Sequence, residues 1–127
     1  MAIKIDDLAQ AVGLELEDYA EDISRAAKAA VKAVAKETVA DVKRRSPVDH
    51  GNYKKSWTQS TVAETPRSLS VSVHNRKHYR LTHLLEKGHA KVGGGRTRAQ
   101  PHIAPAEQDA ERALLQKIQE GIREVSQ

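Results

Sequence analysis

Histidine is the residue type in this sequence that most readily suggests chemistry, because imidazole ligates metals and transfers protons near neutral pH. There are six, at positions 50, 74, 78, 83, 89 and 102. His74 and His78 are four residues apart, but they lie on either side of a predicted strand end and need not share a face. A metal site requires several ligands that converge, and the sequence contains no cysteine. We therefore expect no metal and no other cofactor.

Two further segments suggest an activity on phosphates. Gly93-Gly94-Gly95-Arg96-Thr97 is glycine-rich, but a P-loop needs Gly-x-x-x-x-Gly-Lys-Ser/Thr between a strand and a helix, and this segment has neither the lysine nor the strand. The surroundings of His78, Tyr79, His83 and His89 resemble in composition the face of a small basic ribonuclease. Such an enzyme needs an acid–base pair and a phosphate clamp at one site. The spacing shows no such convergence, so we expect no catalytic residues.

The positive charge is concentrated in one part of the chain. Residues 67–98 carry eight lysines and arginines against a single acid, Glu86, whereas the whole chain has a net charge of only +4. A plain electrostatic surface facing DNA or an acidic partner subunit explains this better than catalysis does. We expect Glu86 to pair with Arg76, Arg80 or an arginine of a neighbouring subunit. The candidate contacts to DNA or a partner are Arg76, Lys77, Arg80, Lys91, Arg96 and Arg98.

A long helix over about residues 15–45 is the most strongly indicated element. Apolar residues recur there at steps of three and four, acids cluster in the early turns, and Lys43, Arg44 and Arg45 lie in the last turn. Pro47 ends the helix, and residues 46–51 form a turn. We expect a shorter helix over residues 5–12, broken at Gly13, to precede it.

The middle of the chain is predicted to be β-rich. Residues 57–64 and 69–74 form a hairpin around residues 65–68, since Leu69, Val71 and Val73 alternate with polar residues. A short helix over residues 82–88 begins at Thr82 as its N-cap and ends at Gly88. Residues 91–100 form a mobile loop. A last helix over residues 104–125 carries an apolar stripe.

Together these elements predict an α+β fold in which a long N-terminal helix and a C-terminal helix pack on one face of a small antiparallel sheet. The chain of 127 residues is expected to be a single domain, with a helical arm (1–45), a β-rich middle with the basic loop (46–100) and a C-terminal helix (101–127). Aromatic residues make up only 3% of the chain. Because the core is therefore thin, we expect the subunit to complete its burial against neighbouring copies. No segment approaches the ~18 apolar residues of a membrane span, and we expect a soluble protein made in a reducing cytoplasm.

Three segments carry a resemblance to a known family. Residues 46–57 read Ser-Pro-Val-Asp-His-Gly-Asn-Tyr-Lys-Lys-Ser-Trp, residues 83–89 read His-Leu-Leu-Glu-Lys-Gly-His, and residues 101–106 read Pro-His-Ile-Ala-Pro-Ala. In order and spacing they resemble the "A-P-V-D-T-G-x-L-x-x-S", "Y-x-x-x-x-E-F/Y-G-T/H" and "P-F-L-x-P-A" signatures of a phage family typified by the gene-ten product of the lambdoid phage HK-ninety-seven. The departures are His50 for threonine, Tyr53 for leucine or arginine, and Lys87 for an aromatic residue.

The resemblance implies a structural virion protein of a tailed phage that forms a homo-oligomeric ring at the head–tail junction or upper tail. Its expected partners are other copies of itself, neighbouring connector and tail proteins, and channel DNA through phosphates, with no membrane. It would lie in the virion neck or tail, and in the host cytoplasm during assembly. A small basic nucleic-acid-binding protein or ribonuclease toxin is the alternative. The motif residues expected to be structural are Pro47, Asp49, Gly51, Glu86, Gly88, Pro101 and Pro105.

Overall fold

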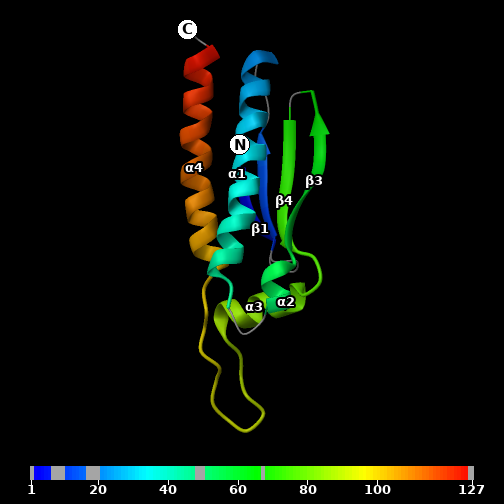
Figure 1. Ribbon diagram of the computed structural model, residues 1–127, viewed down its shortest axis with the longest axis vertical. Helices are drawn as coiled ribbons and strands as arrows, with labels where there is room; N and C mark the ends of the chain where they lie inside the picture. Colours follow the sequence, from blue (N-terminus) through cyan, green and yellow to red (C-terminus); the bar gives the residue numbers. More distant parts are fainter. Residues whose placement is uncertain (1, 7–10, 17–20, 48–50, 67, 126–127) are drawn as a thin grey trace.

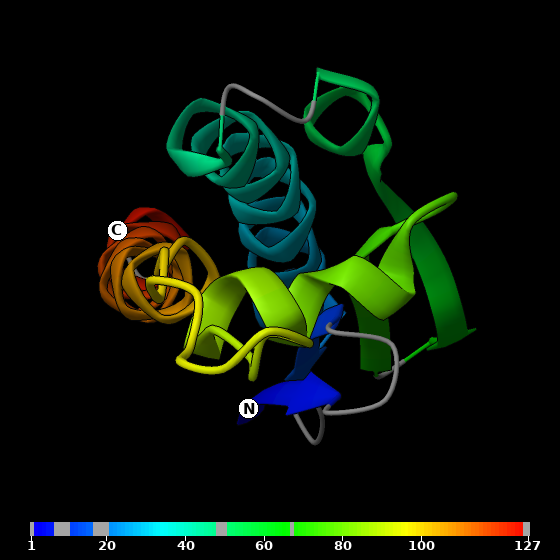
Figure 2. The ribbon, with the colours of Figure 1, turned by 90° about the horizontal axis from the view of Figure 1, so that it is seen from below.

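The computed structural model describes residues 2–6, 11–16, 21–47, 51–66 and 68–125. Four strands form one antiparallel sheet in the order β1-β2-β4-β3, and α1 and α4 lie side by side on one face of it (Figures 1 and 2). The predicted α+β class is confirmed. The elements are β1 (Ala2–Asp6), β2 (Ala11–Leu16), α1 (Glu21–Arg45), α2 (Gly51–Lys55), β3 (Trp57–Thr65), β4 (Ser68–Asn75), α3 (Tyr79–Lys87) and α4 (Ile103–Val125).

The N-terminal part differs from the prediction. The short helix expected over residues 5–12 is wrong, because β1 and β2 pair as an antiparallel hairpin there. The long helix begins at Glu21 instead of residue 15, which lies in β2. The sequence Ile3-Lys4-Ile5-Asp6 alternates apolar and charged residues. Because a period of two is typical of a strand, this alternation outweighs the weaker helical spacing.

Helices α1 and α4 run antiparallel along most of the length of the molecule (Figure 1). Their contact is lined by small residues. Gly121 of α4 lies so close to α1 that an added Cβ would stand 3.2 Å from the Cβ of Ala26. The abundance of alanine in α1 therefore lets the two backbones approach closely, as ridge-into-groove packing with short side chains requires.

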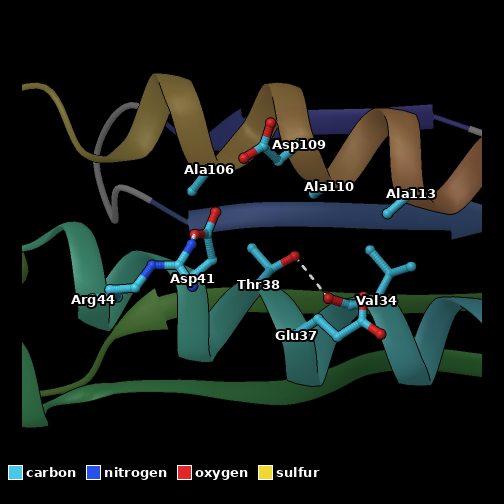
Figure 3. Close-up of a pocket in the computed structure, with 9 residues that line it drawn as sticks. All are labelled: Val34, Glu37, Thr38, Asp41, Arg44, Ala106, Asp109, Ala110 and Ala113. Atoms are coloured by element: carbon cyan, nitrogen blue, oxygen red, sulfur yellow. Dashed lines mark hydrogen bonds and ion pairs between the residues drawn. The ribbon is translucent and has the colours of Figure 1, made fainter.

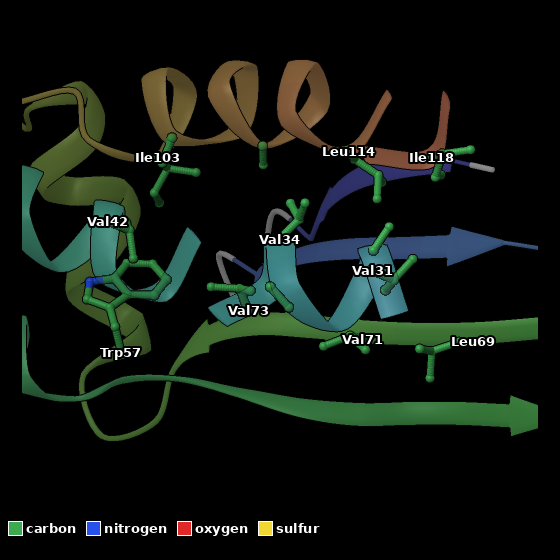
Figure 4. Packing of buried hydrophobic residues seen from close by; sticks show 14 of the residues in the cluster. Val31, Val34, Val42, Trp57, Leu69, Val71, Val73, Ile103, Leu114 and Ile118 are labelled. Carbon is green, nitrogen blue, oxygen red and sulfur yellow. The ribbon is translucent and has the colours of Figure 1, made fainter. Parts of the chain in front are cut away.

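The core lies between these helices and the sheet (Figure 4). The predicted alternation of β4 is confirmed, since Leu69, Val71 and Val73 are buried while Ser70 and Ser72 are only half-buried. Valine, leucine and alanine fill most of this core, and its two large aromatic side chains lie at one end. The buried apolar residues are Ala27, Ala30, Val31, Val34, Ala35, Val42, Tyr53, Trp57, Leu69, Val71, Val73, Ile103, Ala106, Ala110, Leu114 and Ile118.

Two local predictions need correction. Helix α3 begins at Tyr79, so Thr82 is not its N-cap but a fully buried residue within the helix. Of the predicted turn over residues 46–51, Gly51 belongs instead to α2, and residues 48–50 lie outside the described residues. Other boundaries are confirmed: the β3–β4 hairpin is present, Gly88 with φ +74° ends α3, and α4 begins one residue before the predicted start.

Candidate functional site

The three motif segments meet at one end of the molecule, which we call the motif end: α2, α3 and the start of α4 at residues 101–105 (Figure 1, bottom). Figure 2 views this end directly. Pro47 is buried just after α1. Asp49 and His50 lie outside the described residues. The segments, far apart in sequence, are therefore joined in space.

Glu86 of α3 closes the N-terminus of α4. Its Oε1 accepts hydrogen bonds from the backbone N–H groups of His102 (2.7 Å) and Ile103 (2.9 Å), and its Oε2 accepts from Ala104 (3.0 Å). The next residue is Pro105, which has no N–H. The four backbone groups that a helix leaves unsatisfied at its start are thus all accounted for. The expected pairing of Glu86 with Arg76 or Arg80 is corrected: in the described part of the chain, the side chain that Glu86 contacts is that of His102. Pairing with an arginine of a neighbouring subunit stays a prediction.

His102 continues this contact into the core. Its Nδ1 lies 2.8 Å from the carbonyl oxygen of Gln100 and 3.1 Å from Oε1 of Glu86. Both neighbours are acceptors, so Nδ1 carries the proton. Nε2 of the neutral ring is then free to accept from the Tyr53 hydroxyl at 2.5 Å. Glu86, His102 and Tyr53 therefore form one hydrogen-bonded chain that joins α3, α4 and α2.

The aromatic rings around this chain pack edge to face. The Tyr53, Trp57 and His102 rings have centroids 5.5–6.2 Å apart with interplanar angles near perpendicular, a favourable arrangement for aromatic pairs. Tyr53 and His102 are only 1% and 0% exposed. Burial raises the pKa of the Tyr53 phenol far above its ordinary range, so it remains a hydroxyl donor.

The carboxylate of Glu86 stays ionised to low pH. Burial raises its pKa, but the hydrogen bonds from the His102 side chain and from three backbone N–H groups outweigh burial and lower it to about 2. A negative charge at the N-terminus of α4 also suits the helix dipole. The residue therefore acts as a charged cap.

Asn75 fixes the turn between β4 and α3. Its side-chain nitrogen donates to the carbonyl oxygen of Tyr53 (2.8 Å), and its side-chain oxygen accepts from the backbone N–H of His78 (2.8 Å). Asn75 is 2% exposed. The side chain thus holds in place the turn that carries Arg76 and Lys77. Sequence reasoning missed it, although an asparagine at the end of a strand is a common turn former.

Arg76 and Lys77 face a surface hollow of about 580 Å³, which we call the basic hollow. Lys43 from the end of α1 and Lys55 from α2 complete its cationic lining. No carboxylate lines it, and within the described residues none of the four cations belongs to an ion pair. The other lining residues are Asn52, Ser56, Trp57, Thr58 and His78. An unbalanced basic hollow of this kind attracts anions.

The remaining predicted cations lie elsewhere at the same end. Arg80 projects from α3 with its guanidinium carbon 5.8 Å from the centre of the Tyr79 ring. Lys91, Arg96 and Arg98 lie in the loop between α3 and α4, which extends beyond the body of the subunit (Figure 1). The structure therefore divides the six predicted contact residues between a hollow, a helix and a loop.

The loop holds itself together by internal hydrogen bonds. The N–H of Lys91 donates to the carbonyl of Gly95 (2.9 Å), and the N–H of Thr97 donates to that of His89 (2.8 Å). Arg96 donates to the carbonyl of Gly88 at 3.3 Å. The side chains of the loop are nonetheless mostly exposed. The mobility expected of this loop stays a prediction.

A second hollow, of about 240 Å³, lies between α1 and α4 (Figure 3). Its acidic residues are engaged: Asp41 pairs with Arg44 and Arg45, and Asp109 pairs with Arg45 (2.5 Å) and Arg112 (2.7 Å). Of these four pairs, only Arg45–Asp109 joins the two helices, and such a pair stabilises the helix contact modestly. The acidic residues of this hollow are therefore already paired, and the hollow offers no cluster of unpaired charge to a ligand.

The five histidines that the structure describes do not form a common site. His83 and His89 are exposed, His74 and His78 are half-buried, and His102 is buried. Over the described residues, no three side chains of the metal-ligating types gather closely enough to hold an ion. Within the same residues, no helix is long and apolar enough to cross a membrane.

Comparison with known proteins gives one match. Residues 10–88, more than half of the chain, match the family described as "Bacteriophage HK97-gp10, putative tail-component". This range includes β2, α1, α2, the β3–β4 hairpin and α3. No curated protein and no solved structure matches the chain.

Proposed function

Because the chain belongs to the Bacteriophage HK97-gp10 tail-component family and so has a structural role in a phage, we propose that it is a ring subunit at the head–tail junction or upper tail. In this role it joins or completes head and tail during assembly in the host cytoplasm, and it remains in the virion neck. The observation that carries the proposal is the family match over residues 10–88.

The charge distribution supports a place beside the DNA channel or an acidic neighbour. The basic hollow, Arg80 and the loop with Lys91, Arg96 and Arg98 all lie at the motif end. Cations that contact phosphates bind without reading sequence. Such contacts suit a protein that meets whatever sequence stands in the channel, and the same surface suits an acidic ring above or below.

Loss of the chain tests this function. A phage that lacks the chain is expected to produce full heads and separate tails, counted by negative-stain electron microscopy of lysates. Supplying the chain from a plasmid should restore joined particles. Normal particles and normal titre without the chain would contradict the proposal.

The basic loop gives a finer test. A triple Lys91/Arg96/Arg98→Ala variant is expected to fold, because these side chains are exposed, but to yield particles whose heads and tails fail to join or which leak DNA. The matched variant is Arg76/Lys77→Ala, which removes charge from the basic hollow. Normal titre with the loop variant would show that the loop is a spacer.

Binding without turnover is part of the same proposal. The connected acid–histidine–tyrosine chain, Glu86–His102–Tyr53, is enclosed in the core and serves to join three helices. Pure protein incubated with labelled RNA and DNA, with and without a divalent metal, should leave both intact. Cleavage that is abolished by His83→Ala or His89→Ala would favour the ribonuclease alternative.

A further inference from the structure

The outer strand β3 is unusually exposed for a strand of nine residues. Trp57 at its start is buried, but every residue from Gln59 to Thr65 is exposed. Successive residues of a strand point to opposite faces of the sheet. Exposure of all of them means that both faces of β3 stay largely open beyond Thr58, although Lys28, Lys32 and Lys36 of α1 lie beside one face. The strand order leaves one edge of β3 without a further strand in the described chain.

The composition of β3 does little to protect this edge. Natural proteins blunt exposed edges with lysine, proline, inward charges or bulges. The segment Gln59-Ser60-Thr61-Val62-Ala63 has no charge and no proline. Glu64, the one charged residue of β3, is held by Lys28 at 3.1 Å. Within the strand itself, the protective feature is an irregularity between Thr61 and Ala63, where Val62 is 66% exposed.

The opposite edge of the sheet has the matching polarity. All neighbouring strands are antiparallel, and an antiparallel sheet with an even number of strands has outer strands that run in opposite directions. If the β1 edge of a second copy lies beside β3, the new pair is again antiparallel and the helices of both copies stay on the same side. Repetition of this head-to-tail contact forms a ring when the rotation between copies closes, and a closed ring leaves no free edge.

The registers also agree. Ile3 pairs with Leu14, Leu14 with Val71, and Val71 with Thr61. These four residues therefore form one row across the sheet. In a ring whose copies are related by rotation without a shift along the strands, Ile3 of the next copy lies beside Thr61.

We propose that copies of this chain assemble by β-strand addition, with the β1 edge of one copy pairing with the exposed β3 edge of the next. This inference rests on the proposed ring and names the surfaces that build it. A symmetric β3–β3 dimer is disfavoured because it would leave two β1 edges open and could not propagate.

Engineered cysteines test the contact, since the natural chain has none. The double variant Ile3→Cys/Thr61→Cys is oxidised as purified protein and within particles of its phage, because residues that are directly opposite on paired strands lie within disulfide reach. We expect a ladder of covalent trimers and larger species on a denaturing gel. The double variant Ile5→Cys/Thr61→Cys detects a ring in which neighbouring copies are shifted by two residues along the strands. Each single variant is expected to run as a monomer on the gel.

Two results would overturn the inference. Covalent dimers from Thr61→Cys alone, in a yield equal to the ladder, would show that β3 pairs with itself. The absence of a ladder from both double variants, in solution and in particles, would show that β1 does not cover β3. A ladder from a protein that is absent from the neck would contradict only the proposed function. A chain present in the neck without a ladder there would contradict only the strand contact.

A second variant keeps the test independent of disulfides. Val62→Lys places a charge at the irregular point of the edge and is expected to lower the fraction of assembled protein at least tenfold, measured by analytical ultracentrifugation or by incorporation into particles. Leu115→Lys is the matched control for the β3 edge, because Leu115 is 47% exposed on α4, and α4 lies on the opposite side of the molecule from β3 (Figure 1). Equal assembly of both variants and the wild type would contradict the proposal.

Discussion

The motif end and the β3 edge differ in how far each satisfies its own polar groups. At the motif end, Glu86 accepts from three backbone N–H groups and His102 connects it to Tyr53. At the β3 edge, seven successive residues are exposed and no further strand of the described chain pairs with β3. Buried polar groups are normally paired within a subunit, so an uncovered strand indicates surface reserved for a neighbour. The motif end therefore stabilises the subunit, and the β3 edge serves assembly. Mutations at the motif end should lower stability, whereas mutations at the β3 edge should lower association.

Removal of the Glu86 side chain should have the largest effect on stability. Glu86→Ala deprives three N–H groups at the start of α4 of their acceptor and leaves His102 without its ionised partner. Loss of charged caps and buried hydrogen bonds predicts a decrease of about 3 kcal/mol in the free energy of unfolding. Urea denaturation followed by circular dichroism measures it. Glu64→Ala is a control on exposed β3, and an equal decrease there would erase the contrast between the two regions.

The dependence of stability on pH should show that Glu86 acts through its negative charge. The pKa of Glu86 in the folded protein, about 2, lies below the ordinary glutamate value of 4.5. The contribution of Glu86 to stability is therefore fully present above about pH 4.5 and is lost as pH falls toward 2. The stability difference between the wild type and Glu86→Gln should narrow by roughly 2 kcal/mol over that range. Glu107 is a control of opposite sign, because burial and Glu111 raise its pKa. A difference that stays constant with pH would show that Glu86 is not a charged cap.

Gly88 should tolerate a side chain much less well than the glycines at the loop tip. It has φ +74° and ψ 171°, and an added Cβ would stand 2.5 Å from the carbonyl oxygen of Thr97. Gly88→Ala is expected to cost about 2 kcal/mol, because such backbone angles are essentially restricted to glycine. Gly95 also has a positive φ, but open space surrounds it, so Gly95→Ala should cost about 1 kcal/mol. Thermal unfolding compares the two, and equal costs would mean that the loop does not pack against Gly88.

Tyr53→Phe should have a smaller effect within the motif end. The ring remains packed against Trp57 and His102, while Nε2 of His102 loses its donor. One unsatisfied buried acceptor predicts a loss of about 1–2 kcal/mol. Equilibrium unfolding measures this loss. Stability equal to that of the wild type would show that the hydroxyl does not link α2 to α4.

Val62→Lys should have the smallest effect on stability and the largest on association. An exposed substitution of this kind changes the free energy of unfolding by less than about 0.5 kcal/mol. Differential scanning calorimetry at a concentration where the protein is monomeric checks this value. A large loss of stability in the monomer would mean that β3 packs within its own subunit.

The sequence predicted those parts of the fold that repeat a simple pattern. The alternation of Leu69, Val71 and Val73 located β4, and the three- and four-residue steps located α1 and α4. The prediction from sequence failed where strand alternation and helical spacing competed, as in β1 and β2. It also failed where the start of a helix depended on a residue distant in sequence. Asn75, which precedes Arg76 and Lys77 and holds their turn, is such a case, since Tyr53, one of its two partners, becomes its neighbour only after β4 and α2 are in place.

The candidate site was predictable in its residues but not in its contacts. Glu86, Gly88, Pro101 and Pro105 were identified by their motif segments. That Glu86 reaches across to the start of α4 could not be read from the sequence, because His102 lies sixteen positions further along the chain, beyond a loop. Lys43 and Lys55 joined the cationic surface only through the packing of α1 and α2.

Cryo-electron microscopy of the complete phage particle tests the central claim most directly. We expect a closed ring of this chain at the head–tail junction or upper tail, with a sheet that continues from each copy to the next through β3 and β1. A particle whose neck and upper tail contain no density for this chain would contradict the assigned place of the protein.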